Sequence, residues 1–155
     1  MRLSISAAAA ALGFGLTGQA LAGDISPQAN RAYLAANAAK PGVVVLPSGL
    51  QYRIIKSGAG QTPHPEDVVT VSYKGALVDG IVFDQTKPGE TRNLPAGKVV
   101  PGWMEALSLM KEGDEWELVI PSELGYGSAR AGNAIPPNQV LVFDLQLIAV
   151  VRAHP

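Results

Sequence analysis

Four segments of the chain alternate apolar and polar side chains, and this period of two constrains the fold more than any other feature. They are residues 50–54, 69–73, 115–120 and 141–147, and the last runs on as an apolar stretch to Val151. Strands with one apolar and one polar face are typical of an antiparallel sheet that covers a single core. The chain is therefore predicted to form such a sheet.

A hairpin is predicted between two further short strands. Asp79-Gly80 lies between the apolar residues 76–78 and 81–83. An Asp-Gly pair between apolar runs is a strong hairpin signal because both residues tolerate the backbone angles of a tight turn. We therefore expect residues 76–78 and 81–83 to pair as antiparallel neighbours.

One segment, residues 101–110, has helical instead of strand periodicity. Its apolar residues recur at the spacing i, i+3, i+4, i+7, which forms one stripe along a helix. They are Trp103, Ala106, Leu107 and Met110. A sheet with one apolar face needs a cover, and this helix is the strong candidate. The predicted fold class is α+β, with a curved sheet wrapped around one short helix.

The first 22 residues have the pattern of a secretory signal peptide. Arg2 is followed by an apolar stretch over residues 3–16 and by Ala20-Leu21-Ala22, an A-x-A cleavage pattern. The apolar run is too short to span a bilayer comfortably, so an uncleaved anchor helix is the less favoured alternative. Asp24 stands where a lipoprotein would need cysteine, which excludes a lipid anchor of that kind. We expect cleavage after Ala22 and export to the periplasm or the medium, with no membrane anchor.

A short helix is predicted after the signal peptide. Ser26 can cap its N-terminus, Pro27 suits the first helical position, and Pro41-Gly42 stops it. Tyr33 and Leu34 are its only large apolar residues. A helix of this kind is marginal alone, so it either docks on the rest of the chain or frays.

These patterns divide the chain into a signal peptide (1–22), a helical extension (23–41) and one domain (42–155). An extension of that length buries too little apolar surface for a stable obligate interface. The mature protein is therefore predicted to be mainly monomeric.

Composition excludes several kinds of chemistry. The chain has no cysteine, so disulfides, thiol nucleophiles and thiolate metal sites are excluded. His64 and His154 have no second ligand at suitable spacing, so no metal site is predicted. A net charge of -1 is too neutral for a nucleic-acid binder. Neither a phosphate-binding glycine loop nor a Ser/His/Asp set is indicated, and no cofactor is expected.

An apolar pocket is suggested by residues in unusual places. Tyr126 lies in a glycine-rich loop, which continues through small polar residues to Ile135-Pro136-Pro137. Any one aromatic residue is more often simply core, but an exposed loop with these residues indicates the rim of a site. Asp84 directly follows Phe83 at the end of an apolar run. It is either a strand-end cap or a polar group beside the pocket.

Five motifs in register resemble the FKBP-type peptidyl-prolyl cis-trans isomerases over about residues 42–151. A sixth, Leu46-Pro-Ser-Gly-Leu-Gln-Tyr52, is similar to the bacterial exported branch related to the macrophage infectivity potentiators. The five motifs are Val71-Ser-Tyr-Lys-Gly75, Asp79-Gly-x-x-Phe-Asp84, Val99-Val-Pro-Gly-Trp103, Leu124-Gly-Tyr-Gly127 and Ile135-Pro-Pro-Asn-x-x-Leu-Val-Phe-Asp144.

The resemblance implies a half-open antiparallel sheet around a short helix and an isomerase acting on X-Pro bonds of exported proteins, open to macrolide inhibitors of the rapamycin type. Trp103 resembles the indole that forms the floor of the family's pocket. Tyr126 resembles the rim tyrosine whose hydroxyl forms a hydrogen bond with a carbonyl group of the substrate or inhibitor. Asp84 is similar to the polar group beside the twisted amide, and Ile135 to the rim residue of the proline-rich loop. The implied walls are Tyr73, Phe83, Val99, Val100 and Phe143.

The sequence departs from the family pattern on one side of the pocket. Residues 91–94 lack the aromatic wall that the family usually has there, and Leu94 is expected to take its place. Lys74, Ala131 and Ala134 also change the expected rim. A non-catalytic chaperone or peptide-binding module with the same pocket therefore stays an alternative to the enzyme. A structural envelope protein with a filled aromatic core is a weaker one, because it does not explain the Tyr126 loop.

Overall fold

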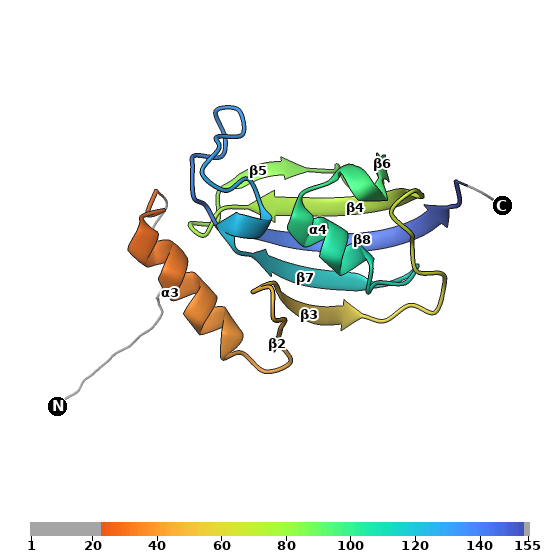
Figure 1. Ribbon diagram of the computed structural model, residues 1–155, viewed down its shortest axis with the longest axis horizontal. Helices are drawn as coiled ribbons and strands as arrows, with labels where there is room; N and C mark the ends of the chain where they lie inside the picture. The colour runs from red at the N-terminus through yellow and green to blue at the C-terminus, as the bar shows by residue number, and fades with distance from the viewer. Residues whose placement is uncertain (1–22, 154–155) are drawn as a thin grey trace.

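The structure is a computed structural model that describes residues 23–153, so the predicted signal peptide lies outside the described residues. A curved antiparallel sheet of seven strands wraps around one short helix (Figure 1). A second helix packs at one end of the sheet. This arrangement confirms the predicted α+β architecture.

The sheet joins strands that are far apart in the chain. Its order is β2-β3-β7-β8-β4-β5, and β6 also pairs with β4. The strands β2 and β6 were not predicted, because each is short and lacks a run of alternating side chains. The bounds are β2 Val44–Val45, β3 Gln51–Lys56, β4 Val68–Ala76, β5 Val82–Gln85, β6 Arg92–Pro95, β7 Glu115–Ile120 and β8 Leu141–Val151.

The alternation seen in the sequence matches the two faces of the sheet. In β8, Leu145 and Leu147 are buried in the core, whereas Asp144 and Gln146 face outward. The predicted hairpin also forms, between β4 and β5. Its loop is longer than Asp79-Gly80 alone, because Leu77 N–H donates to Ile81 O across the three residues 78–80. A three-residue loop is the next most common hairpin connection.

The covering helix is α4, Pro101–Leu107, and it lies across the sheet in Figure 1. The four residues of the predicted stripe are all buried. The helix ends earlier than predicted, at Leu107, and Met110 reaches the core from the following turn. Gly102 lets α4 approach β7 closely, because a Cβ atom there would lie 2.6 Å from Ile120 Cγ2.

The predicted N-terminal helix is α3, Pro27–Ala38, and it docks on the domain. Ser26 caps it, since its hydroxyl oxygen accepts from Ala29 N–H at 3.1 Å. Tyr33 and Leu34 pack with Ile25 and Ala29 against a small buried cluster formed by Val78, Val119 and Val140. Within residues 23–153, neither helix has the length and apolar character needed to span a bilayer.

Candidate active site

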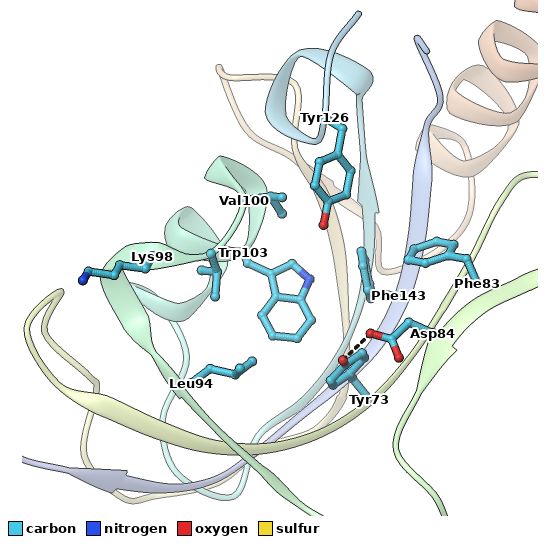
Figure 2. A pocket seen from close by; sticks show the side chains of 10 residues that line it. Tyr73, Phe83, Asp84, Leu94, Lys98, Val100, Trp103, Tyr126 and Phe143 are labelled. Atoms are coloured by element: carbon cyan, nitrogen blue, oxygen red, sulfur yellow. Dashed lines mark hydrogen bonds between the residues drawn. The ribbon is translucent and has the colours of Figure 1, made fainter. Parts of the chain in front are cut away.

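The candidate site is a cavity of about 440 Å³. Side chains from β4, β5, β6, α4 and β8 meet there with residues 98–100, which precede α4, and with one residue from the loop after β7 (Figure 2). The lining residues are Tyr73, Phe83, Asp84, Leu94, Lys98, Val99, Val100, Trp103, Tyr126 and Phe143. Every residue that the sequence nominated for the site is in this set except Ile135.

Trp103 forms the buried base of the cavity and is 4% exposed. Its indole meets Tyr73 nearly edge to face, with centroids 5.1 Å apart and planes at 86°. It meets Phe143 in the same manner at 5.2 Å and 81°, and Phe143 meets Phe83 at 5.6 Å and 88°. Aromatic rings prefer this geometry to a face-to-face stack. The aromatic walls therefore hold one another in place.

Gly75 makes this ring packing possible. A Cβ atom at Gly75 would lie 2.5 Å from Phe143 Cε1 and 2.7 Å from Phe83 Cζ. Both distances are far shorter than the optimum between carbon atoms, about 3.5–4.0 Å. The bare backbone of β4 is therefore what allows the two phenylalanine rings to meet over it.

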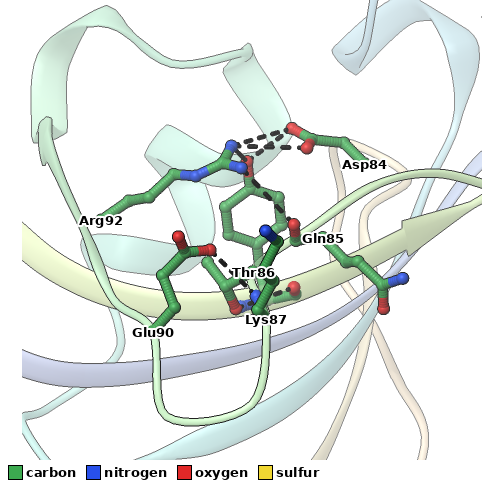
Figure 3. Close-up of polar contacts among 7 residues, drawn as sticks. Asp84, Gln85, Thr86, Lys87, Glu90 and Arg92 are labelled. Carbon is green, nitrogen blue, oxygen red and sulfur yellow. Dashed lines mark hydrogen bonds and ion pairs between the residues drawn. The ribbon is translucent and has the colours of Figure 1, made fainter.

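A polar corner with fixed geometry adjoins the rings. Tyr73 O–H donates to Asp84 Oδ2 at 2.5 Å (Figure 2), and Arg92 Nη1 donates to the Tyr73 hydroxyl oxygen. Arg92 Nη1 also lies 3.3 Å from both carboxylate oxygens of Asp84 (Figure 3). Burial, with the hydrogen bond to Asp84 and its negative charge, raises the pKa of Tyr73 to about 12. The Tyr73 hydroxyl therefore keeps its proton at neutral pH and donates it in the hydrogen bond to Asp84.

These contacts favour one of the two sequence interpretations of Asp84. Its hydrogen bonds within residues 23–153 go to the side chains of Tyr73 and Arg92, with none to a backbone N–H group. Its side chain is 44% exposed and lines the cavity. Asp84 is therefore a polar group beside the pocket, not a strand-end cap.

Arg92 is the site residue that sequence reasoning missed. The segment 91–94 was noted only for its lack of an aromatic residue, yet β6 pairs with β4 and places Arg92 opposite Val71. Arg92 then reaches Tyr73, two residues further along β4, and its guanidinium carbon lies 5.4 Å from the Tyr73 ring centroid. The period of two between Arg92 and Leu94, which lines the cavity as expected, was the available signal.

Lys98 was also missed as a lining residue. Figure 2 shows its amine directed away from the aromatic rings, so its stem is what borders the cavity. No group of three or more His, Asp or Glu side chains in residues 23–153 is placed to hold a metal ion.

The rim is supplied by the connection between β7 and β8. Tyr126 is 42% exposed, and Figure 2 shows its hydroxyl directed into the space between Trp103 and Phe143. Ile135 differs from its predicted place on the rim: it is 4% exposed and belongs to the core. The loop folds back on itself, with Ala131 N–H donating to Ile135 O at 3.0 Å, and this turn takes Ile135 inward.

Comparison with known protein families gives two adjoining matches. Residues 59–148 match the model of the FKBP-type peptidyl-prolyl cis-trans isomerases. Residues 17–54 match the model of the domain amino terminal to such isomerases. The second match includes α3, β2 and the first four residues of β3, and the first includes all the residues that line the cavity.

Two curated relatives are similar over most of this chain. One is the "Outer membrane protein MIP" of Legionella longbeachae, 50% identical over 123 residues, which are 79% of this chain and 53% of that protein. Another is the FKBP-type 22 kDa peptidyl-prolyl cis-trans isomerase of Escherichia coli, 48% identical over 120 residues, which are 77% and 58%. The chain thus spans about half the length of the relatives it matches.

Solved structures show the same fold. A peptidyl-prolyl cis-trans isomerase from Pseudomonas syringae pv. tomato superimposes with a TM-score of 0.75 at 39% identity, covering 81% of this chain and 92% of that one. FkpA from Escherichia coli does so with a TM-score of 0.77 at 40% identity, covering 85% and 62%. With its sheet, its pocket and these matches taken together, the chain belongs to the family of FKBP-type peptidyl-prolyl cis-trans isomerases.

Proposed function

We propose that this protein accelerates cis-trans isomerisation of X-Pro peptide bonds in exported proteins. The observation that carries the proposal is the cavity itself, in which interlocked aromatic rings meet one rim hydroxyl and one ion-paired carboxylate. Relatives named as peptidyl-prolyl isomerases support it. We propose Phe83, Asp84 and Tyr126 as its catalytic residues, and Tyr73, Val99, Val100, Trp103 and Phe143 as its substrate-binding residues.

The reaction needs no acid, base or nucleophile, so it suits an apolar site with one fixed carboxylate. Partial double-bond character gives the X-Pro amide a rotation barrier of roughly 18–20 kcal/mol. Resonance places negative charge on the carbonyl oxygen, and water stabilises that planar form. Twisting the bond removes the resonance, so an apolar pocket that excludes water disfavours the planar state more than the twisted one. Each tenfold acceleration needs only about 1.4 kcal/mol of this difference.

Each part of the cavity has a place in this scheme. The prolyl ring lies against Trp103, between the walls formed by Phe83 and Phe143. The Tyr126 hydroxyl donates to a substrate carbonyl oxygen and orients the chain. Asp84, held by Tyr73 and Arg92, sets a fixed electrostatic field along one side of the twisting amide.

Export and monomeric state are part of the proposal. The segment 1–22 has the signal-peptide pattern, and one relative is named an outer membrane protein. Gly23 N lies 2.8 Å from Asp79 Oδ2. Cleavage after Ala22 would turn this nitrogen into an α-ammonium group, which could then form an ion pair with the Asp79 carboxylate. The clients are exported proteins with X-Pro bonds, and a macrolide of the rapamycin type is an expected inhibitor.

The test is turnover of a prolyl tetrapeptide by the purified mature chain, with and without rapamycin. We expect acceleration that rapamycin abolishes. Tyr126→Phe removes one hydroxyl, so it should keep the melting temperature and weaken peptide binding by about 1 kcal/mol. Asp84→Leu should keep the fold and lower the turnover rate. If both variants fold and turn over peptide like the parent, the assignment of the site is wrong.

One observation favours a second candidate function, a chaperone or peptide-binding module without turnover. Leu94 lines the cavity where the family usually has an aromatic wall, so the prolyl group is less tightly enclosed on that side. The same assay decides between the two functions. Peptide binding that rapamycin competes away, with no acceleration of isomerisation, would establish the module and exclude the enzyme.

A further inference from the structure

The helix α3 buries two asparagine side chains, and these are its only buried residues. Asn30 is 5% exposed and Asn37 is 3% exposed. Burying an amide group is costly unless it is hydrogen-bonded. The partners of these two side chains therefore show which parts of the domain α3 is held against.

Asn30 ties α3 to the end of the loop that precedes β8. Its Oδ1 accepts from Val140 N–H at 2.8 Å, and its Nδ2 lies 3.2 Å from Gln139 Oε1. The same Nδ2 donates to Ile25 O and Ser26 O at the start of α3. Gln139 is 7% exposed, and its Nε2 donates a hydrogen bond to Ile25 O at 3.3 Å. The two buried amides thus join α3 to the loop in both directions.

The same loop carries the rim of the candidate active site. Asn138, next to Gln139, donates its N–H to Gly127 O at 2.7 Å, and Gly127 follows Tyr126 in the chain. Gly127 N–H in turn donates to Ser122 O at 2.8 Å. A short series of bonds therefore runs from Asn30 to the residue beside Tyr126. Figure 1 shows α3 beside the end of the sheet from which this loop projects.

We propose that Asn30 is a positioning residue for the site, and that α3 acts as an intramolecular brace for the Tyr126 loop. The connection from Pro121 to Val140 contains only one short 3-10 turn, η2 (Ser122–Leu124), and an isolated bridge. Ordering such a loop costs conformational entropy, and a brace that orders it in advance removes that cost from substrate binding. The effect on turnover rests on the proposed isomerase function, whereas the brace itself does not.

Asn37 provides a matched control on the same helix. Its Nδ2 donates to Gln51 Oε1 at 2.8 Å, and Gln51 Nε2 donates to Leu34 O at 3.1 Å. These bonds hold the other end of α3 to β3, away from the loop. The Oδ1 atom of Asn37 is buried with no hydrogen-bond partner among residues 23–153. Asn37→Ala therefore removes a buried amide that makes fewer hydrogen bonds than Asn30, without touching the segment that carries Tyr126.

The experiment compares the mature chain with its Asn30→Ala and Asn37→Ala variants by amide hydrogen exchange and by prolyl-peptide kinetics. For Asn30→Ala we expect about tenfold faster exchange at Gly127, Asn138 and Val140, which corresponds to the loss of about one hydrogen bond. We also expect KM to rise about three- to tenfold, with a smaller change in kcat, because the loop carries Tyr126, whose hydroxyl binds and orients a substrate carbonyl group in the proposed function. For Asn37→Ala both quantities should stay within about twofold of the parent.

Equal effects of the two variants, or unchanged loop exchange in Asn30→Ala, would overturn the proposal. If Asn30→Ala does not fold, Gln139→Ala breaks the same junction from the loop side and decides the question by the same measurements. A parent chain without turnover would refute the proposed function alone. The exchange measurement would then still establish or exclude the brace.

Discussion

Replacing Gly75 with alanine adds a single methyl group at the place where two walls of the pocket meet. The new Cβ atom would lie 2.5 Å from Phe143 Cε1 and 2.7 Å from Phe83 Cζ. Measured against a carbon-carbon optimum of about 3.5 Å, the contacts are too short by about 1.0 Å and 0.8 Å. One or both rings must therefore move by roughly that distance. Phe143 is 5% exposed and packed against Trp103, so it has little free space to move into.

Two consequences of different size follow from this displacement. Overpacking in a filled core typically costs about 1–3 kcal/mol, so the melting temperature of the variant should fall by several degrees. A misplacement of about 1 Å in a site that works by positioning can cost about a hundredfold in rate. We therefore expect Gly75→Ala to lower kcat/KM by up to about a hundredfold, while its free energy of unfolding falls by only about 1–3 kcal/mol.

The assay pairs thermal melting with prolyl-peptide kinetics, and Gly89→Ala serves as the control. Gly89 has φ +78° with nothing within 4 Å of an added Cβ atom, so alanine there strains the backbone by about 1 kcal/mol without pushing on any ring. We expect Gly89→Ala to melt earlier and to keep its turnover below the melting transition. If Gly75→Ala keeps kcat/KM within twofold of the parent, the argument that Gly75 sets the ring geometry fails.

Four further predictions concern the fold, its pH dependence and the processed chain. Phe83→Ala should lower both stability and turnover. Because Phe83 is only half-buried, the stability loss should be smaller than the roughly 3–5 kcal/mol of a fully buried phenylalanine. A variant with the melting temperature and turnover of the parent would contradict this. Hydrogen bonds from His64 N–H and Ala153 N–H, together with Arg152, lower the pKa of Asp67 to about 2 from 3.8. Its contribution to stability is present above about pH 4 and is lost as the pH falls toward 2, so Asp67→Asn should flatten that part of a melting-temperature profile. Intact-mass analysis of envelope-fraction protein should give a chain that begins at Gly23, and a species that retains residues 1–22 would disprove cleavage. Sedimentation at micromolar concentration should give a monomer mass, and a dimer mass would contradict the predicted monomeric state.

The strands and the covering helix were predictable because their signals are local. A strand that is half-buried must alternate its side chains, and a helix that covers a sheet must repeat its apolar residues every three or four positions. The segments 69–73, 115–120 and 141–147 and the stripe from Trp103 to Met110 satisfy these requirements in the sequence itself. Three of the pocket residues, Tyr73, Trp103 and Phe143, lie on these elements. The other nominated residues came from the motifs shared with the family.

Contacts between distant segments were decided only by the tertiary structure. Arg92 meets Asp84 and Tyr73 because β6 pairs with β4, and the spacing of Arg92 and Leu94 does not by itself show which strand β6 joins. Ile135 is buried because the loop folds back at Ala131, a turn that its small polar residues do not specify.

Asn30 is the clearest example of this division. In the sequence it is one polar residue of an alanine-rich helix, with nothing to separate it from Asn37. Its partner Val140 lies 110 residues away, and no local propensity reports on a bond across such a distance. The sequence by itself indicated the long strands and the two helices. Which buried amide supports the loop of Tyr126 depended on how those elements pack, because a hydrogen bond is made by position in space and not by position in the chain.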